Sequence, residues 1–310
     1  MNRKKIHLLA IVVTVWVVVS VTWVIYTGES KGVIVRFAVE LNDHSAAFWV
    51  ALDKGWFIEK GIVIKYKTFS TGLELVAALT RGDVDIAIAC IGPLLIAYDR
   101  GIKIKLVSMI HNHGYAIVVN PGKVKDIHDL NEKAITASGP GSPTWLLLKL
   151  VEKKYNLSFN ILRNPPFIAI STLLAGKVDA SSLPEHYVTL AEHMGAKVLL
   201  RSQDIWPDMP GSGLAVTEDF LVKHRDIVVK IVEVIEKAVR YIKENPDEAA
   251  DIVAKHLASD VNIMEESMSY LEYTVEINMV ELKRYIGYLI EFHCVSHNIS
   301  LSEFVENLTG

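Results

Sequence analysis

The chain has 310 residues, of which 51% are hydrophobic and 22% are charged. This composition supplies a sizeable apolar core, which excludes a chain that is disordered throughout. The formal net charge is −4, and beyond residue 30 the chain carries 29 basic and 35 acidic residues, which disfavours a nucleic-acid-binding protein. The length fits one large or two ordinary domains.

The first 30 residues have the pattern of a membrane segment. The basic start "MNRKK" precedes an apolar run over Leu8–Tyr26, which is long enough to span hydrocarbon and would keep its N-terminus in the cytoplasm. A cleaved signal peptide is the alternative, but no clear small-residue cleavage site follows Tyr26. The only cysteines, Cys90 and Cys294, lie too far along for a lipoprotein and predict no disulfide framework. We therefore expect residues 1–30 to anchor the chain, with the rest on the extracellular face of the membrane or in a periplasm-like space.

Short apolar strands then alternate with helical stretches. Gly82 and Gly101 stand where two of the predicted helices should end. The alternation predicts an α/β fold with a parallel-rich sheet. The predicted strands cover residues 33–41, 62–69 and 84–91, and the predicted helices follow them over residues 46–57, 72–82 and 93–101.

A set of eight residues, which includes those that end predicted helices and open predicted strands, recurs at a constant offset of 94 positions. In each copy a helix ends at Gly, a strand opens with Val-Asp, and a later strand opens after Gly-x-Lys. This repeat predicts two lobes of similar build with a cleft between them, where small ligands usually bind. The first copy consists of Gly82, Val84, Asp85, Ala97, Gly101, Lys103, Leu106 and Ser108, and the second of Gly176, Val178, Asp179, Ala191, Gly195, Lys197, Leu200 and Ser202.

After Thr217 the pattern becomes helical. One stripe of apolar residues predicts an amphipathic helix, and Pro246 is a good first residue for the next one. Further helical segments over 264–271 and 280–297 predict an all-helical tail that packs on the first lobe. The stripe consists of Val228, Ile231, Val232, Ile235, Val239 and Ile242.

Several segments together resemble the solute-binding proteins of ABC importers for nitrate, aliphatic sulfonates and taurine, a family that includes binders of thiamine-precursor pyrimidines. The segments are "AAFWVALDKGWFIEKGIVIKY", "STGLELVAALTRGDVDIAIACIGPLLIAYDRGIKIKLV", "NHGYAIVV", "GSPTWLLLKLV" and "ENPDEAADIVAKH". The resemblance implies a two-lobed type II periplasmic-binding fold with an inter-lobe cleft. It implies that the chain crosses between lobes near Tyr115–Asn120 and Gly211–Val216. Lobe 1 would comprise residues 31–116 and 214–310, and lobe 2 residues 117–213.

The resemblance also implies a function. A monomer without cofactor or metal would capture a small polar or anionic solute of the sulfonate, taurine or nitrate type. It would deliver this solute to an ABC permease with its ATPase. An aminopyrimidine is the alternative solute. An enzyme on the same fold is less well supported, since the sequence shows no nucleophile–base set and no Cys-rich iron signature, and a sensor would need a cytoplasmic output domain.

The stretch "SGPGSPTW" joins a predicted buried strand to an apolar-faced helix. A helix that begins near Ser142 or Pro143 leaves backbone N–H groups and partial positive charge at this point. Gly141 allows close approach of a ligand, and the hydroxyls of Ser142 or Thr144 can cap the helix or bind the ligand. Such a terminus suits an anionic head group, and an ordinary capped helix is the alternative. We take Ser138 as the first residue of this candidate site.

Other candidate ligand-binding residues follow the strands of the predicted first lobe. Each has a plainer explanation as a turn, a capped helix or a solvated loop. His111 and His113 alternate on one strand, but no third ligand at useful spacing supports a metal site. These candidates are His44, Ser70, Thr71, Gly92, Pro93, His113 and Gly114.

The predicted second lobe contributes three further candidates. Glu185 in "SLPEHY" would suit a ligand amine or an amidine-like ring, although a first-turn acid that stabilises the following helix is an equally simple explanation. The side chain of Trp206 could form part of the cleft wall, and the side chain of Ser212 could point into the cleft. Trp49, Trp56 and Phe57 are spaced as core residues.

Overall fold

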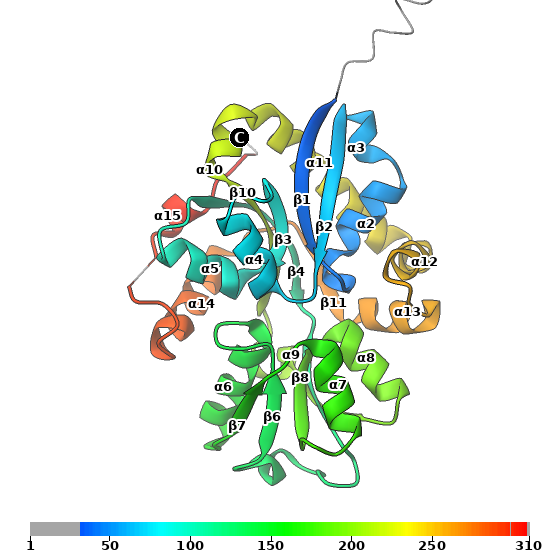
Figure 1. Cartoon of the computed structure of the whole chain (residues 1–310), viewed down its shortest axis with the longest axis vertical. Helices are drawn as coiled ribbons and strands as arrows, with labels where there is room; N and C mark the ends of the chain where they lie inside the picture. Colours follow the sequence, from blue (N-terminus) through cyan, green and yellow to red (C-terminus); the bar gives the residue numbers. More distant parts are fainter. Residues whose placement is uncertain (1–31, 298, 309–310) are drawn as a thin grey trace, which may run out of the picture.

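The computed structural model describes residues 32–297 and 299–308 (Figure 1). The anchor predicted for residues 1–30 lies outside these described residues. Within the described part of the chain, no helix combines the length and apolar character needed to cross a membrane.

The first sheet has six strands in the order β11-β4-β10-β3-β1-β2. The strands β2, β1 and β3 pair in parallel, while β10 and β11 pair antiparallel with their neighbours, so the sheet is mixed rather than parallel-rich as predicted. The antiparallel pairs arise because the chain returns to this sheet from elsewhere. The strands are β1 Val33–Glu40, β2 Ile62–Phe69, β3 Ile86–Cys90, β4 Ile104–His113, β10 Pro210–Thr217 and β11 Leu271–Tyr273.

The second sheet has five strands in the order β7-β6-β8-β5-β9. Here β6 pairs in parallel with β7 and β8, and β5 pairs antiparallel with β8 and β9. The strands are β5 Tyr115–Val119, β6 Ala134–Ala137, β7 Asn160–Arg163, β8 Ala180–Pro184 and β9 Lys197–Arg201.

The predicted repeat is confirmed as a structural one. Three consecutive elements of the first sheet's layer, α4 Gly72–Thr80, β3 and α5 Ile91–Asp99, recur with the same lengths as α7 Pro166–Leu174, β8 and α8 Glu185–His193. Each element of the second set begins 94 residues after its counterpart. In the first sheet β1 lies between its parallel neighbours β2 and β3, and in the second sheet β6 lies between its parallel neighbours β7 and β8. The two sheets therefore have similarly built cores.

The chain passes between the sheets twice (Figure 1). The first passage is the junction at Gly114 between β4 and β5, and the second covers residues 202–209, which include the short helix α9 Ser202–Ile205. The segments expected to cross, 115–120 and 211–216, instead form strands of the second and first sheet. The passages lie a few residues earlier because both strands are needed for sheet pairing.

Helices cover both faces of the first sheet. In β1, Phe37 and Val39 pack with α2 Ala46–Asp53 and α11 Arg225–Glu244, while the alternate residue Ala38 packs with α4 and α5. Trp49, Trp56 and Phe57 are buried in this core, as predicted. The other helices before the C-terminal segment are α3 Trp56–Glu59 and α6 Pro143–Tyr155, with the short 3-10 helices η1 Asp43–Ser45 and η2 Ile127–Leu130.

The C-terminal segment is mostly helical. The predicted stripe of α11 is buried, and α12 begins at Pro246. The prediction of an all-helical tail was wrong at β11, which adds an edge strand to the first sheet, and α13 also packs against α8 of the second sheet. The tail helices are α10 Glu218–Lys223, α11, α12 Pro246–Leu257, α13 Val261–Ser269, α14 Met279–Glu291 and α15 Leu301–Phe304.

Candidate functional site

A small cavity of about 20 Å³, enough for about one water molecule, lies between the two sheets. Its walls come from the carboxyl ends of β1, β2, β3, β6 and β8 and from the first turns of the helices that follow, where α/β folds usually bind ligands. We call it the central cavity. It is lined by Glu40, Ser70, Thr71, Gly72, Leu73, Cys90, Pro93, Tyr115, Ser138, Ser142, Pro143, Thr144, Pro166 and Pro184.

The repeat brings equivalent residues to opposite walls of the central cavity. Gly72 and Pro166 occupy equivalent positions, and so do Cys90 and Pro184; all four line the cavity. Seven of the predicted site residues line it as well: Ser70, Thr71, Pro93, Ser138, Ser142, Pro143 and Thr144. The constant offset was therefore a usable signal for site residues that we did not name from sequence.

Glu40 is the charged residue of this lining, and the sequence analysis missed it. It ends β1, its exposed fraction is 3%, and its Oε1 accepts a hydrogen bond from the Cys90 thiol at 2.9 Å. Its Oε2 accepts from Asn42 Nδ2 at 3.2 Å. The Tyr115 hydroxyl lies 3.4 Å from Cys90 Sγ. A carboxylate at the carboxyl end of a buried strand was the available sequence signal.

Burial dominates the electrostatics of this group. It raises the pKa of Glu40, and it raises the pKa values of Cys90 and Tyr115 well above their ordinary values. Among the described residues that line the central cavity, none is Lys, Arg or His. The protein side of the cavity therefore offers hydroxyls, a thiol and a carboxyl group, but no cationic side chain.

The stretch "SGPGSPTW" forms the N-terminus of α6, as predicted. The Ser142 hydroxyl caps the helix by accepting from the backbone N–H of Trp145 at 3.2 Å, and it donates to the Gly139 carbonyl at 2.7 Å. Thr144 Oγ1 accepts from the backbone N–H of Ser138 at 3.1 Å. The ordinary capping role is therefore present in a turn that also lines the central cavity.

The N-terminus of α4 is built in the same way on the other wall. Thr71 caps this helix by accepting from the backbone N–H of Glu74 at 3.3 Å. The hydroxyls of Ser70 and Ser138 differ from these caps, because neither has a hydrogen-bond partner among the described residues. They are the hydroxyls of the lining that remain available to a solute.

Gly92 and Gly141 form the contact between the two walls beside the cavity rather than its lining. A Cβ at Gly92 would clash with the Gly141 carbonyl oxygen, and a Cβ at Gly141 would clash with Ile96. Glycine at both positions allows the turn before α6 to approach α5 closely.

His44 and Gly114 lie behind the cavity at the first passage between the sheets. His44 is fully buried and its Nε2 donates to the Gly114 carbonyl at 3.0 Å, while its Nδ1 has no partner among the described residues. Burial lowers the pKa of His44 to about 3. One ligand atom each from Glu40, His44 and Cys90 lie within 4.8 Å of one another, a set that a divalent metal could use. His113 ends β4, with Nε2 3.7 Å from Glu272.

Three predicted site residues have partners elsewhere and are not among the residues that line the central cavity. Glu185 is the first residue of α8 and accepts from Arg201 at 3.1 Å. Trp206 is buried and donates to Glu281 at 2.5 Å. Ser212 lies in β10, with its hydroxyl 3.9 Å from Cys90 Sγ.

A second polar region joins the sheets beside the cavity. Asp43, in η1, is fully buried, and the donors nearest its carboxylate, the Ser267 hydroxyl and the backbone N–H of His186, lower its pKa by less than burial raises it. Burial, with the nearby Glu185 carboxylate, raises the pKa of Asp43 to about 7. Burial also raises the pKa of Glu185 to about 7 despite the opposing effect of Arg201. The guanidinium of Arg201 lies 3.6 Å from the centre of the Tyr270 ring, next to α13.

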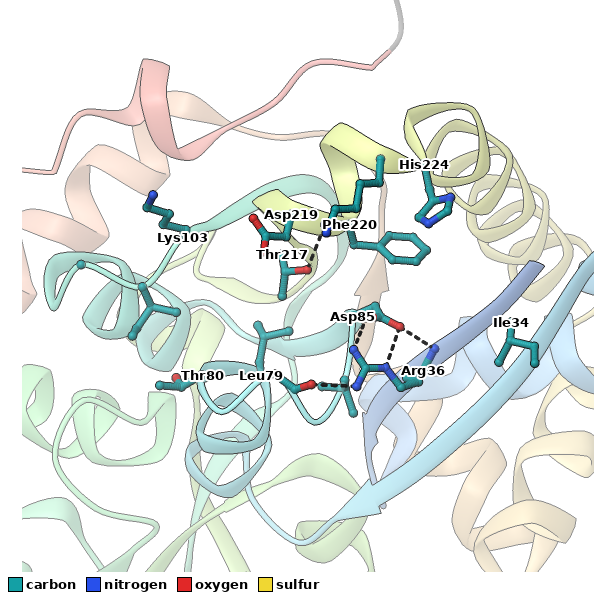
Figure 2. Close-up of a pocket in the computed structure, with 15 residues that line it drawn as sticks. Ile34, Arg36, Leu79, Thr80, Asp85, Lys103, Thr217, Asp219, Phe220 and His224 are labelled. Carbon is teal, nitrogen blue, oxygen red and sulfur yellow. Dashed lines mark hydrogen bonds and ion pairs between the residues drawn. The ribbon is translucent and has the colours of Figure 1, made fainter.

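A broader hollow lies at the other end of the first sheet (Figure 2). Arg36 there donates to Asp85 and to the Gly82 carbonyl, so its guanidinium is already paired. Asp85 is the aspartate of the repeat, and it also accepts from the backbone N–H of Arg36. This hollow involves one sheet and its surface loops, whereas the central cavity draws on both sheets.

Comparison with known proteins gives consistent matches. The family described as "NMT1/THI5 like" matches residues 42–249. A Bacillus subtilis (strain 168) protein named putative aliphatic sulfonates-binding protein is 30% identical over 240 residues, covering 74% of this chain and 71% of that protein. A Brucella abortus (strain 2308) putative binding protein is 26% identical over 245 residues, covering 76% of this chain and 75% of its own length.

Solved structures match the fold. The alkanesulfonate-binding protein from Xanthomonas axonopodis pv. citri, bound to MOPS, has a TM-score of 0.80 at 16% identity, covering 90% of this chain and 99% of its own. The periplasmic nitrate-binding protein from Synechocystis PCC 6803 has a TM-score of 0.77 at 11% identity, covering 86% of this chain and 83% of its own. The chain therefore has the two-sheet α/β fold of periplasmic binding proteins.

Proposed function

The chain belongs to the NMT1/THI5-like family, and from this premise we propose that it is the solute-binding protein of an ABC importer. It captures a small polar solute between its two sheets and delivers it to a permease with its ATPase. The observation that carries the proposal is the central cavity, which equivalent loops from both sheets line. A solute that contacts residues of both sheets binds best when the two sheets and their helices lie together. Its binding is therefore coupled to closure of the protein around it.

We propose that the two sheets are the cores of two lobes, with residues 31–116 and 214–310 in one and 117–213 in the other. The protein acts as a monomer on the extracellular face of the membrane or in a periplasm-like space, held by residues 1–30. The relatives named for a bound solute support a sulfonate- or nitrate-type solute, and taurine is proposed as a member of the sulfonate class. An aminopyrimidine is the second candidate, and the buried carboxyl group of Glu40 favours it over a bare oxyanion.

We propose no catalytic role for the chain, because its named relatives are binding proteins. The test is a thermal-shift and calorimetric screen of the full-length chain, purified in detergent, against sulfonates, taurine, nitrate and aminopyrimidines. Saturable 1:1 binding supports the proposal. The absence of binding to all of these solutes would refute it for these classes, and turnover of a bound solute would support an enzyme instead.

A further inference from the structure

Three donor side chains of different chemistry meet at the carboxyl ends of two strands in the first sheet. One ligand atom each from Glu40, His44 and Cys90 lie within 4.8 Å of one another. Glu40 ends β1, Cys90 ends β3, and His44 lies in η1, just after β1. Because β1 and β3 pair in parallel, the fold brings the carboxylate and the thiol together although they are 50 positions apart in the chain. The solute-binding function proposed above does not use these three residues as a set.

The set is buried and has room beside it for one small occupant. The exposed fractions are 3% for Glu40, 0% for His44 and 4% for Cys90. Glu40 and Cys90 line the central cavity, whose volume of about 20 Å³ suits a single water molecule or ion. The described lining contains a carboxyl group and a thiol but no cationic side chain, so a cation is the occupant that its charges favour.

His44 is oriented as metal-binding histidines usually are. Its Nε2 donates to the Gly114 carbonyl at 3.0 Å, and a bond of this kind fixes the ring orientation and the tautomer of a metal-ligating histidine. With Nε2 as the donor, Nδ1 keeps a free lone pair, and it has no hydrogen-bond partner among the described residues. A fully buried nitrogen without a partner is costly, and a metal ion would satisfy it.

Glu40 is positioned by two donors that can stay in place when an ion binds. Its carboxylate accepts from the backbone N–H of Cys90, and from Asn42 Nδ2 at 3.2 Å. Bonds of this kind orient a ligating carboxylate. The third donor is the Cys90 thiol, 2.9 Å from Oε1 of Glu40. Since a metal binds the thiolate, coordination would release the thiol proton to the buffer and replace this weak S–H···O bond by bonds from both groups to the ion.

We propose that Glu40, His44 and Cys90 bind one divalent metal ion, with water completing its coordination. A set of oxygen, nitrogen and thiolate sulfur suits Zn²⁺ rather than Mg²⁺ or Ca²⁺, which take oxygen ligands. The ligand atoms of a tetrahedral zinc ion lie about 3 to 4 Å apart, so shifts of about 1 Å would complete the site. The thiolate and the carboxylate would balance the charge of the ion. The expectation of no metal rested on the spacing of His111 and His113, which do not belong to this set.

Co²⁺ tests the site directly, because a thiolate bound to this ion gives a charge-transfer band in the near ultraviolet. The full-length chain, purified in detergent and stripped of metal with a chelator, is titrated with Co²⁺ and then with Zn²⁺. One equivalent of Co²⁺ should produce the band, and one equivalent of Zn²⁺ should abolish it. Cys90→Ser should lack the band, whereas Cys294→Ser, the matched control at the only other cysteine of the sequence, should keep it. Glu40→Gln and His44→Phe should each weaken Zn²⁺ binding about 10-fold or more in competition with a chromophoric chelator.

A second measurement on the wild-type chain decides the case in which Cys90→Ser does not fold. Zn²⁺ should slow the alkylation of Cys90, mapped by mass spectrometry, and leave that of Cys294 unchanged. The absence of a cobalt band in the folded wild-type chain, a band that remains in folded Cys90→Ser, or equal protection of both cysteines would overturn the inference. No solute is present in these experiments, so their failure leaves the proposed function intact, and a failure of every solute to bind leaves the metal site intact.

Discussion

Gly92 of α5 lies directly against the carbonyl oxygen of Gly141, in the turn before α6, with no room between them for a side chain. The two residues belong to the layers of different sheets, so their contact closes one side of the central cavity. A side chain at either position must hold the layers apart.

Replacing Gly92 with Val should therefore lower solute affinity by at least 10-fold. The valine side chain would meet the Gly141 carbonyl only when the two layers are together, which penalises the closed arrangement. It would also meet the buried Tyr285 hydroxyl, which lies 2.8 Å from the position of a Cβ, so the variant should lose some stability as well. Calorimetric titration measures the affinity, and circular dichroism checks the fold. Gly55→Ala is a control at a glycine with open space around it, where only local backbone strain is expected. Wild-type affinity in Gly92→Val would show that this contact does not belong to the solute-bound state.

Ser142 and Ser138 are adjacent in the cavity lining but should respond differently to substitution. Ser142→Ala removes the N-cap of α6 and should reduce the free energy of unfolding by about 1 kcal/mol. Ser138→Ala removes a hydroxyl without a protein partner, so it should leave stability nearly unchanged and weaken solute binding several-fold. Urea denaturation and titration of both variants separate the two effects. An equal loss of stability in both variants would contradict these assignments.

Asp43 should make the protein less stable as pH rises. Its pKa is raised from 3.8 to about 7, so the folded state holds a proton that the unfolded chain releases near pH 4. Stability from this group is present in acid and is lost as pH rises through about 7. Asp43→Asn should therefore raise the free energy of unfolding relative to wild type by more at pH 8 than at pH 5, with a difference of up to about 3 kcal/mol between the two pH values.

Unfolding curves at the two pH values test this expectation, with Asp208→Asn, at an exposed loop position, as the control. Glu185 contributes to the same loss of stability with rising pH, since its pKa is also raised to about 7. Burial lowers the pKa of His186 to about 4, so this residue destabilises the fold only below the ordinary pKa of histidine. A larger benefit of Asp43→Asn at pH 5 than at pH 8 would contradict the burial of an uncompensated carboxylate.

Arg201 and Tyr270 connect the second sheet to the C-terminal tail. The guanidinium of Arg201 stacks on the ring of Tyr270, 3.6 Å from its centre. The contact therefore stabilises the arrangement in which the second sheet lies against the C-terminal tail. Tyr270→Leu should weaken solute binding about 2- to 10-fold, the range expected for loss of a cation–π contact of this kind. Tyr241→Leu is the matched control, because Lys54 lies over Tyr241 within the first sheet's helical layer. That variant should lose stability without losing solute affinity.

Much of the fold could be predicted from the sequence because its signals are local or periodic. The repeat located α4, β3 and α5 and their counterparts, and the apolar stripe located α11. The short strand β11 was missed, because "LEY" pairs with β4 only after the intervening residues 114–270 and carries no periodic signal. The passages between sheets were placed a few residues late for the same reason, since strand pairing is a long-range property.

The site was only partly predictable. Ser138, Ser142 and Thr144 line the central cavity, and their Gly- and Pro-rich turn has a local mechanism that can be read from sequence. Glu40 and Cys90 were not chosen because each looks like an ordinary residue at the end of its strand. Their significance arises from a contact between residues 50 positions apart, and from burial beneath the other sheet.

The most direct test of the whole account is a crystal structure of the full-length chain, or of its solute complex from the titration series, with the bound solute resolved. The account predicts the solute in the central cavity, in contact with Ser70 on one wall and with Ser138 on the other. A solute bound in the hollow around Arg36, or one that contacts a single sheet, would contradict it.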